Sequence, residues 1–379
     1  MPQVAYFAHD IADAAIARRA QALRSAGISV AMLAMRRSAT PPPSDVIDLG
    51  RTHDARFAHR LAALGAALPT ALRQRARLAQ ADLWIARNLD MTLLAAAVRA
   101  AIGSRAPLLY ECLDVHRLMT HGGMVGTALR NLEKAVIDAS AGIIVSSPGF
   151  VREYFAPRFD AAAKTILIEN RLGAGLALPP RPLPTATRPD RPLTIGWFGN
   201  LRCRRSLALM RAVARLPNVA VRLCGYPALT EIPDFDAQVQ AEPGLVYGGR
   251  YAYPNDLAAI YGAVDLVWAG DFHDAGANSR WLLPNRLYEG GYFGVPPIAP
   301  AESETGLWLK AHGLGFTLPE PLETTLPDFI RSIALDSVAA ARATMLAAPD
   351  GLFRQPDDEM GALVRRILRP AQSPLPAAA

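Results

Sequence analysis

Short apolar runs alternate with Ala-rich stretches of helical length along most of the chain, and this alternation constrains the fold more than any other feature. In the first half the apolar runs are 4–8, 28–35, 82–87, 107–114 and 142–147. They are typical of buried strands, and the stretch at about 11–26 predicts a helix that stops at Gly27. Buried strands that alternate with helices predict a mostly parallel sheet with helices on both faces.

A second series of the same kind follows a break. Residues 172–193 are rich in Pro and Gly and lack periodicity, which predicts an interdomain linker. The later strand-like runs are 193–200, 219–225, 244–250, 264–270 and 295–300. We therefore expect an α/β fold with two Rossmann-like domains, 1–171 and 194–369, that face each other across a cleft, and a flexible tail at 370–379. Open sheets of this type bind ligands at the carboxyl ends of their strands.

Composition narrows the class of protein. The chain has 379 residues, of which 51% are hydrophobic and 20% charged, as in globular proteins. No apolar run is long enough for a membrane span, and the first residues do not resemble a secretory signal. The three cysteines are scattered and lack the spacing of a metal site, so we expect reduced thiols in a cytoplasmic protein.

Basic residues are concentrated in the first half of the chain. Residues 1–180 hold 21 basic and 14 acidic residues, whereas the remainder is almost neutral. Five arginines flank Leu- and Ala-rich helical stretches within 56–80: Arg56, Arg60, Arg73, Arg75 and Arg77. This pattern indicates either a helix that binds an anionic membrane surface or an ordinary solvated face. Nucleic acid is not expected, because no aromatic residues interleave with the arginines.

The segment IGWFGNLRCRRS (195–206) is a candidate anion site. A strand is followed by Gly199 and Asn200, which we expect to form a tight turn, and then by arginines at the start of a helix. Backbone N–H groups at a helix N-terminus, together with guanidinium groups, suit a diphosphate. The arginines of this segment are Arg202, Arg204 and Arg205. An exposed turn with solvated arginines is the alternative.

A second candidate lies at 281–299. Pro284 and Asn285 suit a helix start, so Arg286 and Glu289 become neighbours on one helical turn. Because this helix lies between two predicted strands, its N-terminus is expected at the same sheet edge as the first segment. There a cation would meet phosphate, and a carboxylate could accept hydrogen bonds from ribose hydroxyls. A surface ion pair is the alternative.

Three segments together resemble the GT-B glycosyltransferases, of the family 4-like, bacterial exopolysaccharide type. They are DIADAAIARRAQALRSAGISVAML (10–33), IGWFGNLR (195–202) and LPNRLYEGGYFGVPPIA (283–299). The resemblance implies a nucleotide-sugar donor, UDP favoured, with Arg286 on the diphosphate, Glu289 on the ribose, and Gly199, Asn200 and Arg202 on the phosphate side. Retaining members carry a second Glu upstream, which would fall near 278–281 and is absent here.

The acceptor site would then belong to the first domain. The segment YECLDVHRLMTHGG (110–123) places Glu111, Asp114, His116 and His121 at the end of a predicted strand. Inverting transfer needs a base for the acceptor hydroxyl. The resemblance favours Asp114 in that role, with His116 as second candidate and His9, Asp10, Glu111 and His121 in the acceptor site. For Asp10 and Asp114 a helix cap or turn is the alternative, and for the histidines an ordinary structural position.

The resemblance further implies a peripheral enzyme at the cytoplasmic membrane face that extends a polyprenyl-diphosphate-linked oligosaccharide. No metal-binding pattern is found, and no cofactor is expected, so arginines and a helix dipole would meet the departing phosphate charge. A uronate donor would need a further cation near the sugar, for which Arg204, Arg205 and Arg280 are the candidates. A nucleotide-sugar 2-epimerase, a Rossmann-type oxidoreductase and a non-catalytic binding protein remain as alternatives.

Overall fold

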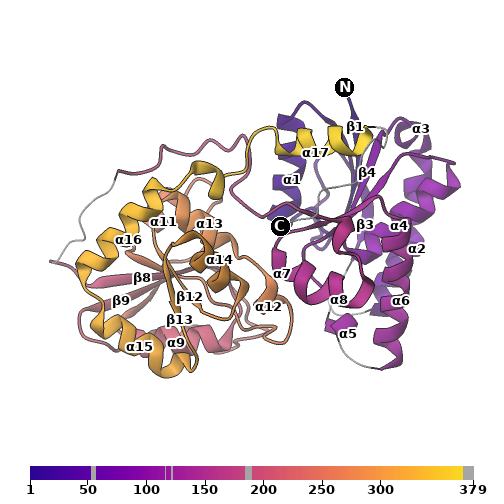
Figure 1. Ribbon diagram of the computed structural model, residues 1–379. Coiled ribbons are helices and arrows are strands. Elements are labelled where there is room, and N and C mark those ends of the chain that lie inside the picture. The colour runs from indigo at the N-terminus through magenta and orange to yellow at the C-terminus, as the bar shows by residue number, and fades with distance from the viewer. Residues whose placement is uncertain (53–56, 116, 121–122, 184–189, 370–379) are drawn as a thin grey trace. The chain divides into compact units, whose positions relative to one another are not determined.

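The computed structural model describes residues 1–52, 57–115, 117–120, 123–183 and 190–369, with the side chains of 57–61 and 117 excepted. The chain forms two compact units (Figure 1). Unit 1 comprises Met1–Glu169, Gly173–Gly175 and the chain from Pro356 onward, and unit 2 comprises Asn170–Leu172 and Leu176–Gln355.

Unit 1 is built on a seven-stranded parallel sheet in the order β3-β2-β1-β4-β5-β6-β7. Its strands are β1 Gln3–Ala8, β2 Ser29–Arg36, β3 Val46–Arg51, β4 Leu83–Arg87, β5 Leu108–Cys112, β6 Gly142–Val145 and β7 Thr165–Leu167. Its helices are α1 Ala14–Ser25, α2 Phe57–Arg73, α3 Arg75–Leu78, α4 Asn88–Ala101, α5 Arg117–Thr120, α6 Met124–Ala139, α7 Pro148–Phe150, the π-helix η1 Val151–Phe155, α8 Ala156–Phe159, the 3₁₀ turn η2 Ala162–Lys164 and α17 Glu359–Leu368.

Unit 2 is built on a six-stranded parallel sheet in the order β10-β9-β8-β11-β12-β13. Its strands are β8 Leu193–Leu201, β9 Val219–Pro227, β10 Leu245–Tyr247, β11 Leu266–Trp268, β12 Pro297–Pro300 and β13 Phe316–Leu318. Its helices are α9 Arg204–Ala214, α10 Phe235–Gln240, α11 Leu257–Gly262, α12 Asn278–Trp281, α13 Asn285–Tyr292, α14 Glu304–His312, α15 Leu322–Ser332, α16 Leu335–Ala347 and the 3₁₀ turn η3 Asp350–Leu352.

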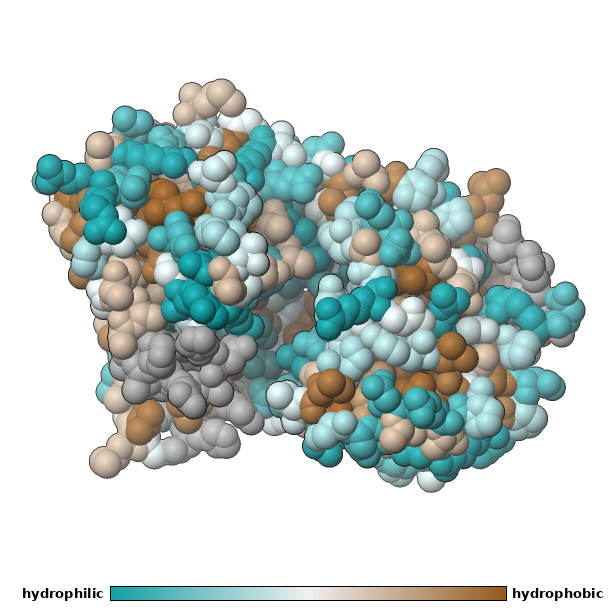
Figure 2. Space-filling view, turned by 180° about the vertical axis from the view of Figure 1, so that it is seen from behind, coloured by the Kyte–Doolittle hydropathy of each residue, from teal (hydrophilic) through white to brown (hydrophobic). Residues whose placement is uncertain are grey.

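Each sheet buries both of its faces, which explains why its central strands are apolar throughout. Alternate residues of β1 enter different cores: Val4 and Tyr6 pack on the side of α1, and Ala5 and Phe7 pack on the side of α2 and α4. The same division separates two cores in unit 2. On the face that Figure 2 shows, hydrophilic residues cover most of the surface, with hydrophobic patches between them.

The unit boundaries differ from the predicted domains at both ends of unit 2. Segment 172–193 is not a free linker where it is described, because Leu176 and Leu178 pack on a unit 2 core and Arg181 donates to the carbonyls of Met345 and Ala348. After Gln355 the chain returns to unit 1, where α17 (yellow in Figure 1) lies beside α1 (indigo). The predicted tail, 370–379, lies outside the described residues.

Candidate functional site

The strand order of each sheet reverses at one point, and there the connections diverge to leave space for a ligand. In unit 1 this switch point lies between β1 and β4, and in unit 2 it lies between β8 and β11. The residues that follow these four strands are therefore the first candidates for a site. Of the described residues among those predicted for the site, the donor-side residues lie around the unit 2 switch point, His9 and Asp10 lie at that of unit 1, and Glu111 and Asp114 lie in and just after β5.

At the unit 2 switch point the predicted turn at Gly199 and Asn200 is wrong. Both residues lie inside β8, which pairs with β9 as far as Leu201. Gly199 has φ +101° and Gly225, its partner on β9, has φ +138°. A Cβ on Gly225 would stand 1.9 Å from the carbonyl oxygen of Gly199, so only glycine allows this approach. The strand ends are thus drawn together, and Asn200 is exposed beside them.

Arg286 lies at the centre of this switch point. It is the second residue of α13, which begins at Asn285 as predicted. Its guanidinium donates to the carbonyl oxygen of Gly270 after β11 (2.7 Å) and lies 3.5 Å from that of Phe198 in β8. Burial lowers the pKa of Arg286, although Asp271 acts in the opposite direction. The half-buried cation therefore spans the two strands between which a ligand is expected.

Glu289 lies one turn further along α13. Its side chain is only 4% exposed, and its Oε2 accepts a hydrogen bond from the hydroxyl of Tyr261 at 2.8 Å. Arg286 and Glu289 thus have different partners, and the contact with Tyr261 fixes the carboxylate. Asn285 is exposed at the start of the helix. The assignment of Glu289 to a ribose stays a prediction.

Two further arginines of the predicted anion site are accessible. Arg202 is half-buried, and its Nη2 lies 3.6 Å from Oδ2 of Asp271. Arg204 is exposed and is the first residue of α9. Cys203 caps this helix, because its Sγ accepts from the backbone N–H of Ser206. Asp271 was not among the predicted residues, although its position directly after a predicted strand could have identified it.

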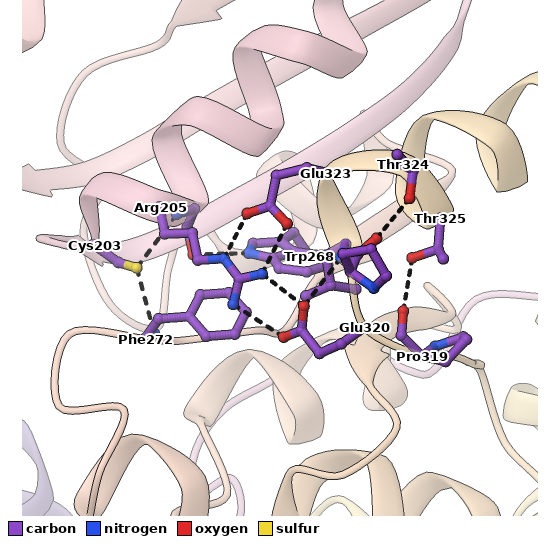
Figure 3. Close-up of polar contacts among 12 residues, drawn as sticks. Cys203, Arg205, Trp268, Phe272, Pro319, Glu320, Glu323, Thr324 and Thr325 are labelled. Atoms are coloured by element: carbon purple, nitrogen blue, oxygen red, sulfur yellow. Dashed lines mark hydrogen bonds and ion pairs between the residues drawn. The ribbon is translucent and has the colours of Figure 1, made fainter.

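Arg205 has a different role from the predicted one. Its guanidinium forms hydrogen bonds with both Glu320 and Glu323, and it stacks on the ring of Phe272 at 4.4 Å (Figure 3). These carboxylates raise its pKa further. Arg205 also lines a cavity of about 190 Å³ together with Asp271, Phe272, Ser279, Arg280 and Glu320, among others. Because its donors are engaged by two carboxylates, Arg205 fastens α9 to α15 and is not a phosphate ligand in this structure.

At the unit 1 switch point His9 and Asp10 follow β1 directly. The Nε2 of His9 lies 3.7 Å from Oδ2 of Asp13, and burial and the nearby Arg87 lower the pKa of His9. Asp10 is buried, accepts from the N–H of Ala12 and pairs with Arg37 at 3.2 Å. Burial and Arg87 therefore favour the neutral form of His9, whereas the carboxylate of Asp13 acts in the opposite direction.

Asp13 and Arg87 belong to the same cluster, and sequence reasoning missed both. Asp13 caps α1 by accepting from the N–H of Ala15, and its other oxygen lies 3.3 Å from Nη2 of Arg87. Burial would raise the pKa of Asp13, but Arg87 and this backbone hydrogen bond outweigh it and lower the pKa. Helix-cap spacing could have identified Asp13, whereas Arg87 gave no signal beyond its place at a strand end.

The prediction that Glu111 belongs to the acceptor site is wrong. Its side chain is 0% exposed and lies 2.8 Å from Arg19, 3.8 Å from Arg87 and 2.6 Å from the hydroxyl of Tyr6. Burial would raise its pKa, but the two arginines and Tyr6 outweigh it and lower the pKa. Glu111 therefore holds Arg87 in place through a buried ion pair. Its own carboxylate is not accessible to a substrate.

Asp114 lies two residues beyond β5 and its side chain is exposed. An exposed carboxylate at this strand end is compatible with the predicted role as a base, which stays a prediction. His116 and His121 lie outside the described residues. Of the predicted acceptor-side residues, the structure thus places His9 and Asp10 at the switch point and Asp114 at the end of the neighbouring strand β5.

Within 1–52, 57–115, 117–120, 123–183 and 190–369, no three His, Cys, Asp or Glu side chains are grouped so that they could hold a metal ion. In the same part of the chain, no helix has the length and apolar character that crossing a bilayer requires.

Comparison with known proteins identifies the family. No protein-family profile matches the sequence. The succinoglycan biosynthesis protein ExoL of Rhizobium meliloti (strain 1021) is 38% identical over 384 residues, an alignment that covers 97% of this chain and 93% of ExoL. The chain belongs to the ExoL family.

Solved structures show the fold of this ExoL-family protein. Sucrose-phosphate synthase from Thermosynechococcus elongatus superposes with a TM-score of 0.72 at 19% identity, covering 97% of this chain and 99% of the other. HepE from Anabaena, in complex with UDP-glucose, gives 0.68 at 16% identity with the same coverage. The predicted fold class and the resemblance to GT-B glycosyltransferases of the exopolysaccharide type are thereby confirmed.

Proposed function

We propose that this ExoL-family protein is a glycosyltransferase that moves a sugar from a UDP-sugar to a lipid-linked oligosaccharide during exopolysaccharide assembly. One observation carries the proposal: Arg286 spans the ends of β8 and β11 at the switch point of unit 2. A guanidinium at this point, with Arg202 nearby, suits a diphosphate. The complexes of HepE with UDP and UDP-glucose support a UDP-sugar donor.

The donor is assigned to unit 2. Arg286 and Arg202 contact the diphosphate, the backbone at Gly199 and Asn200 approaches it, and Glu289 accepts from the ribose. Arg204 adds a further cation and Asn285 a side-chain amide donor, and both are exposed at helix starts. The N-termini of α9 and α13 add their dipoles. These groups together meet the charge of the departing UDP, so the transfer needs neither a divalent ion nor a cofactor.

The acceptor is assigned to unit 1, and the transfer inverts the anomeric centre. The carboxylate of Asp114 takes the proton of the acceptor hydroxyl as its oxygen attacks the anomeric carbon from the face opposite the diphosphate. The bond between that carbon and the diphosphate oxygen breaks, and UDP leaves with the electron pair. His116 is the second candidate for the base, and His9 and Asp10 line the acceptor side.

The acceptor is a polyprenyl-diphosphate-linked oligosaccharide at the cytoplasmic face of the plasma membrane. The excess of basic residues in the first half of the chain supports an anionic partner of this kind. The name of the related ExoL, a succinoglycan biosynthesis protein, supports polysaccharide assembly as the setting.

The test combines binding with turnover. UDP is titrated into the protein by calorimetry, and Arg286→Gln is expected to weaken binding by at least about tenfold, because charge-assisted hydrogen bonds are lost. Arg286→Lys keeps the positive charge but loses the paired donors of the guanidinium, so its affinity for UDP should lie between those of the wild type and Arg286→Gln. Arg331→Gln, an exposed arginine paired with Asp328 on α15, is the matched control and should bind UDP like the wild type.

Transfer is measured with labelled UDP-glucose and a lipid-linked acceptor. Asp114→Asn should bind UDP normally and lose transfer, whereas His116→Gln should retain most of it. Absence of UDP binding in the wild-type protein would refute the proposed function. UDP binding that does not depend on Arg286 would refute the assignment of the donor site.

A further inference from the structure

Asn88 directly follows β4 at the switch point of unit 1 and begins α4, and its backbone conformation is unusual. It has φ +67°, in the left-handed region that residues other than glycine seldom adopt. Thr92, which is fully buried, holds this turn: its hydroxyl donates to the carbonyl oxygen of Asn88 at 2.7 Å and lies 3.2 Å from that of Ala86. Asparagine tolerates the conformation, and glycine would adopt it without strain. Backbone strain at a ligand-binding edge of a sheet points to a functional role for the residue.

His9 occupies the equivalent place on the neighbouring strand. Phe7 of β1 pairs with Ala86 of β4, and His9 and Asn88 each lie two residues further along the chain. Each carries a buried polar atom, the Nδ1 of His9 and the Oδ1 of Asn88, that has no hydrogen-bond partner among the described residues. A buried polar atom without a partner costs free energy. Two such atoms at one strand edge therefore point to a ligand that supplies the missing hydrogen bonds.

The charged groups beside these two side chains are paired with one another. The Nη2 of Arg87 lies 3.3 Å from Oδ2 of Asp13, and the Nε of Arg37 lies 3.2 Å from Oδ2 of Asp10. A phosphate or carboxylate ligand would have to displace one of these carboxylates from its arginine. The hydroxyls of a neutral sugar both donate and accept hydrogen bonds, as do the amide of Asn88 and an uncharged imidazole. The chemistry at this edge therefore suits an uncharged pyranose.

We propose that Asn88 and His9 bind the hydroxyl groups of a neutral sugar, the terminal residue of the acceptor, and that Asn88 determines the specificity of this subsite. The amide of Asn88 accepts from one ring hydroxyl and donates to its neighbour, and the imidazole of His9 contacts a further hydroxyl. Because Thr92 fixes the backbone of Asn88, the amide loses little freedom on binding. This inference rests on the proposed function, which assigns the acceptor to unit 1, and adds to it a residue and a class of sugar.

The first test measures binding of free sugars to the full-length protein by saturation-transfer NMR. The probes are the methyl β-glycosides of glucose, galactose and mannose, with methyl β-glucuronide as the charged comparison. At least one neutral glycoside should bind the wild type. The glucuronide should bind at least about fivefold more weakly than that glycoside, because the carboxylates of Asp10 and Asp13 repel it. Absence of binding by all three neutral glycosides would overturn the proposal, and so would preferred binding of the glucuronide.

The variant Asn88→Gly separates a role of the side chain from a role of the backbone. Glycine keeps the left-handed conformation, so the circular dichroism spectrum should be unchanged. The neutral glycoside should bind about five- to tenfold more weakly, because the hydrogen bonds of the amide are lost. Asn88→Asp removes the amide donors with almost the same shape and should also weaken binding, which gives a second reading should Asn88→Gly fail to fold.

The matched control is Asn218→Gly. Asn218 also has a positive φ (+58°), but it is exposed directly before β9 in unit 2. The same substitution there should leave the affinity for the glycoside at the wild-type value. If Asn88→Gly and Asn88→Asp both bound the glycoside like the wild type, only the backbone conformation of Asn88 would matter, and the proposal would be overturned.

Transfer kinetics identify which sugar the subsite holds. With labelled UDP-glucose and the lipid-linked acceptor, Asn88→Gly should raise KM for the acceptor at least about fivefold, with little change in kcat. KM for UDP-glucose should change by less than about twofold. The reverse pattern would assign the subsite to the sugar of the donor and overturn its assignment to the acceptor.

The two proposals fail in different ways. The diphosphate is assigned to unit 2, so the affinity for UDP should be unchanged in Asn88→Gly. UDP binding and transfer by a protein whose affinity for sugars does not depend on Asn88 would refute the sugar subsite alone. Sugar binding that depends on Asn88, in a protein that does not bind UDP, would refute the proposed function and leave the sugar subsite standing.

Discussion

At the scale of single residues, partners that are distant in sequence decide what an arginine or a carboxylate does. Arg205 and Arg286 both follow apolar strands and both suit a phosphate. Only Arg205 meets Glu320 and Glu323, which lie 115 and 118 positions further along the chain. Glu111 likewise gains Arg19, 92 positions away, and becomes a buried anchor. Local sequence placed the strand ends within a few residues, but it could not show which charged side chains near them are free for a ligand and which pair with another part of the chain.

Asp271 yields a prediction at this scale. Its carboxylate lies 3.6 Å from Arg202 and acts on the pKa of Arg286, so it stands among the cations assigned to the diphosphate. A carboxylate there repels the incoming anion. Asp271→Asn should therefore tighten UDP binding by about three- to tenfold, which corresponds to about 1 kcal/mol. Calorimetry at low ionic strength measures the effect, and added salt should reduce it.

The control is Asp274→Asn, which changes a carboxylate of the same loop that accepts a hydrogen bond from Asn278. It should leave UDP affinity within about twofold of the wild type, because Asp271, and not Asp274, is among the charges that act on the pKa of Arg286. Weaker UDP binding in Asp271→Asn would show that this carboxylate serves mainly to position Arg202, and would contradict the prediction.

At the scale of elements, burial decides which strands the sequence reveals. The predicted runs in the first half match β1, β2, β4, β5 and β6 within a few residues, and those in the second half match β8 to β12. The missed strands are β3, β7 and β13, all of them at a sheet edge. An edge strand has one neighbour and buries less surface, so its apolar pattern is weaker; β7 and β13 are also only three residues long.

Helix α6 holds an ionisable group that couples its packing to pH. The carboxyl of Glu133 is buried between α6 and β5, and it accepts hydrogen bonds from the hydroxyls of Tyr110 and Tyr154. Burial raises the pKa of Glu133 from 4.5 to about 7, although both tyrosine hydrogen bonds oppose the shift. The folded protein therefore resists ionisation of this group more than the unfolded chain does.

The sign of the pH effect follows from this shift. As pH rises from about 4.5 through about 7, the unfolded chain loses the proton first, so the free energy of unfolding falls; above about 7 this contribution is constant. Glu133→Gln keeps an acceptor but cannot ionise, and should raise the free energy of unfolding at pH 8 by up to about 3 kcal/mol. Denaturant titrations at several pH values measure the difference from the wild type.

Asp138→Asn is the control on the same helix, because Asp138 is exposed and pairs with Lys134 on the surface. Its effect on the free energy of unfolding should stay below about 1 kcal/mol and should not follow the same pH window. If the difference between wild type and Glu133→Gln were equal at pH 5 and pH 8, Glu133 would not titrate as described.

At the scale of the whole molecule, composition located the passage from unit 1 to unit 2. It did not predict that the chain after Gln355 belongs to unit 1 again. The Pro- and Gly-rich segment 172–193 marks the passage into unit 2, and its described part packs on that unit. No Pro- and Gly-rich segment signals the return to unit 1 after Gln355, because the sequence of α17 has the pattern of an ordinary amphipathic helix. Only the structure shows that Met360, Leu363 and Val364 complete the core beside α1, whose Ile16 and Leu23 belong to the same cluster.

The last prediction separates the stability of the two units. Leu363 is almost fully buried in the core of unit 1, although it lies in the last part of the chain. Leu363→Ala should destabilise unit 1 by about 2–4 kcal/mol, because a large side chain is removed from a packed core. Amide hydrogen exchange should therefore accelerate in β1 and β2 and stay unchanged in β8 and β9. Leu326→Ala, a buried position of unit 2, should give the reverse pattern. Acceleration of both sheets by either variant would contradict two independent cores and show that the units unfold together.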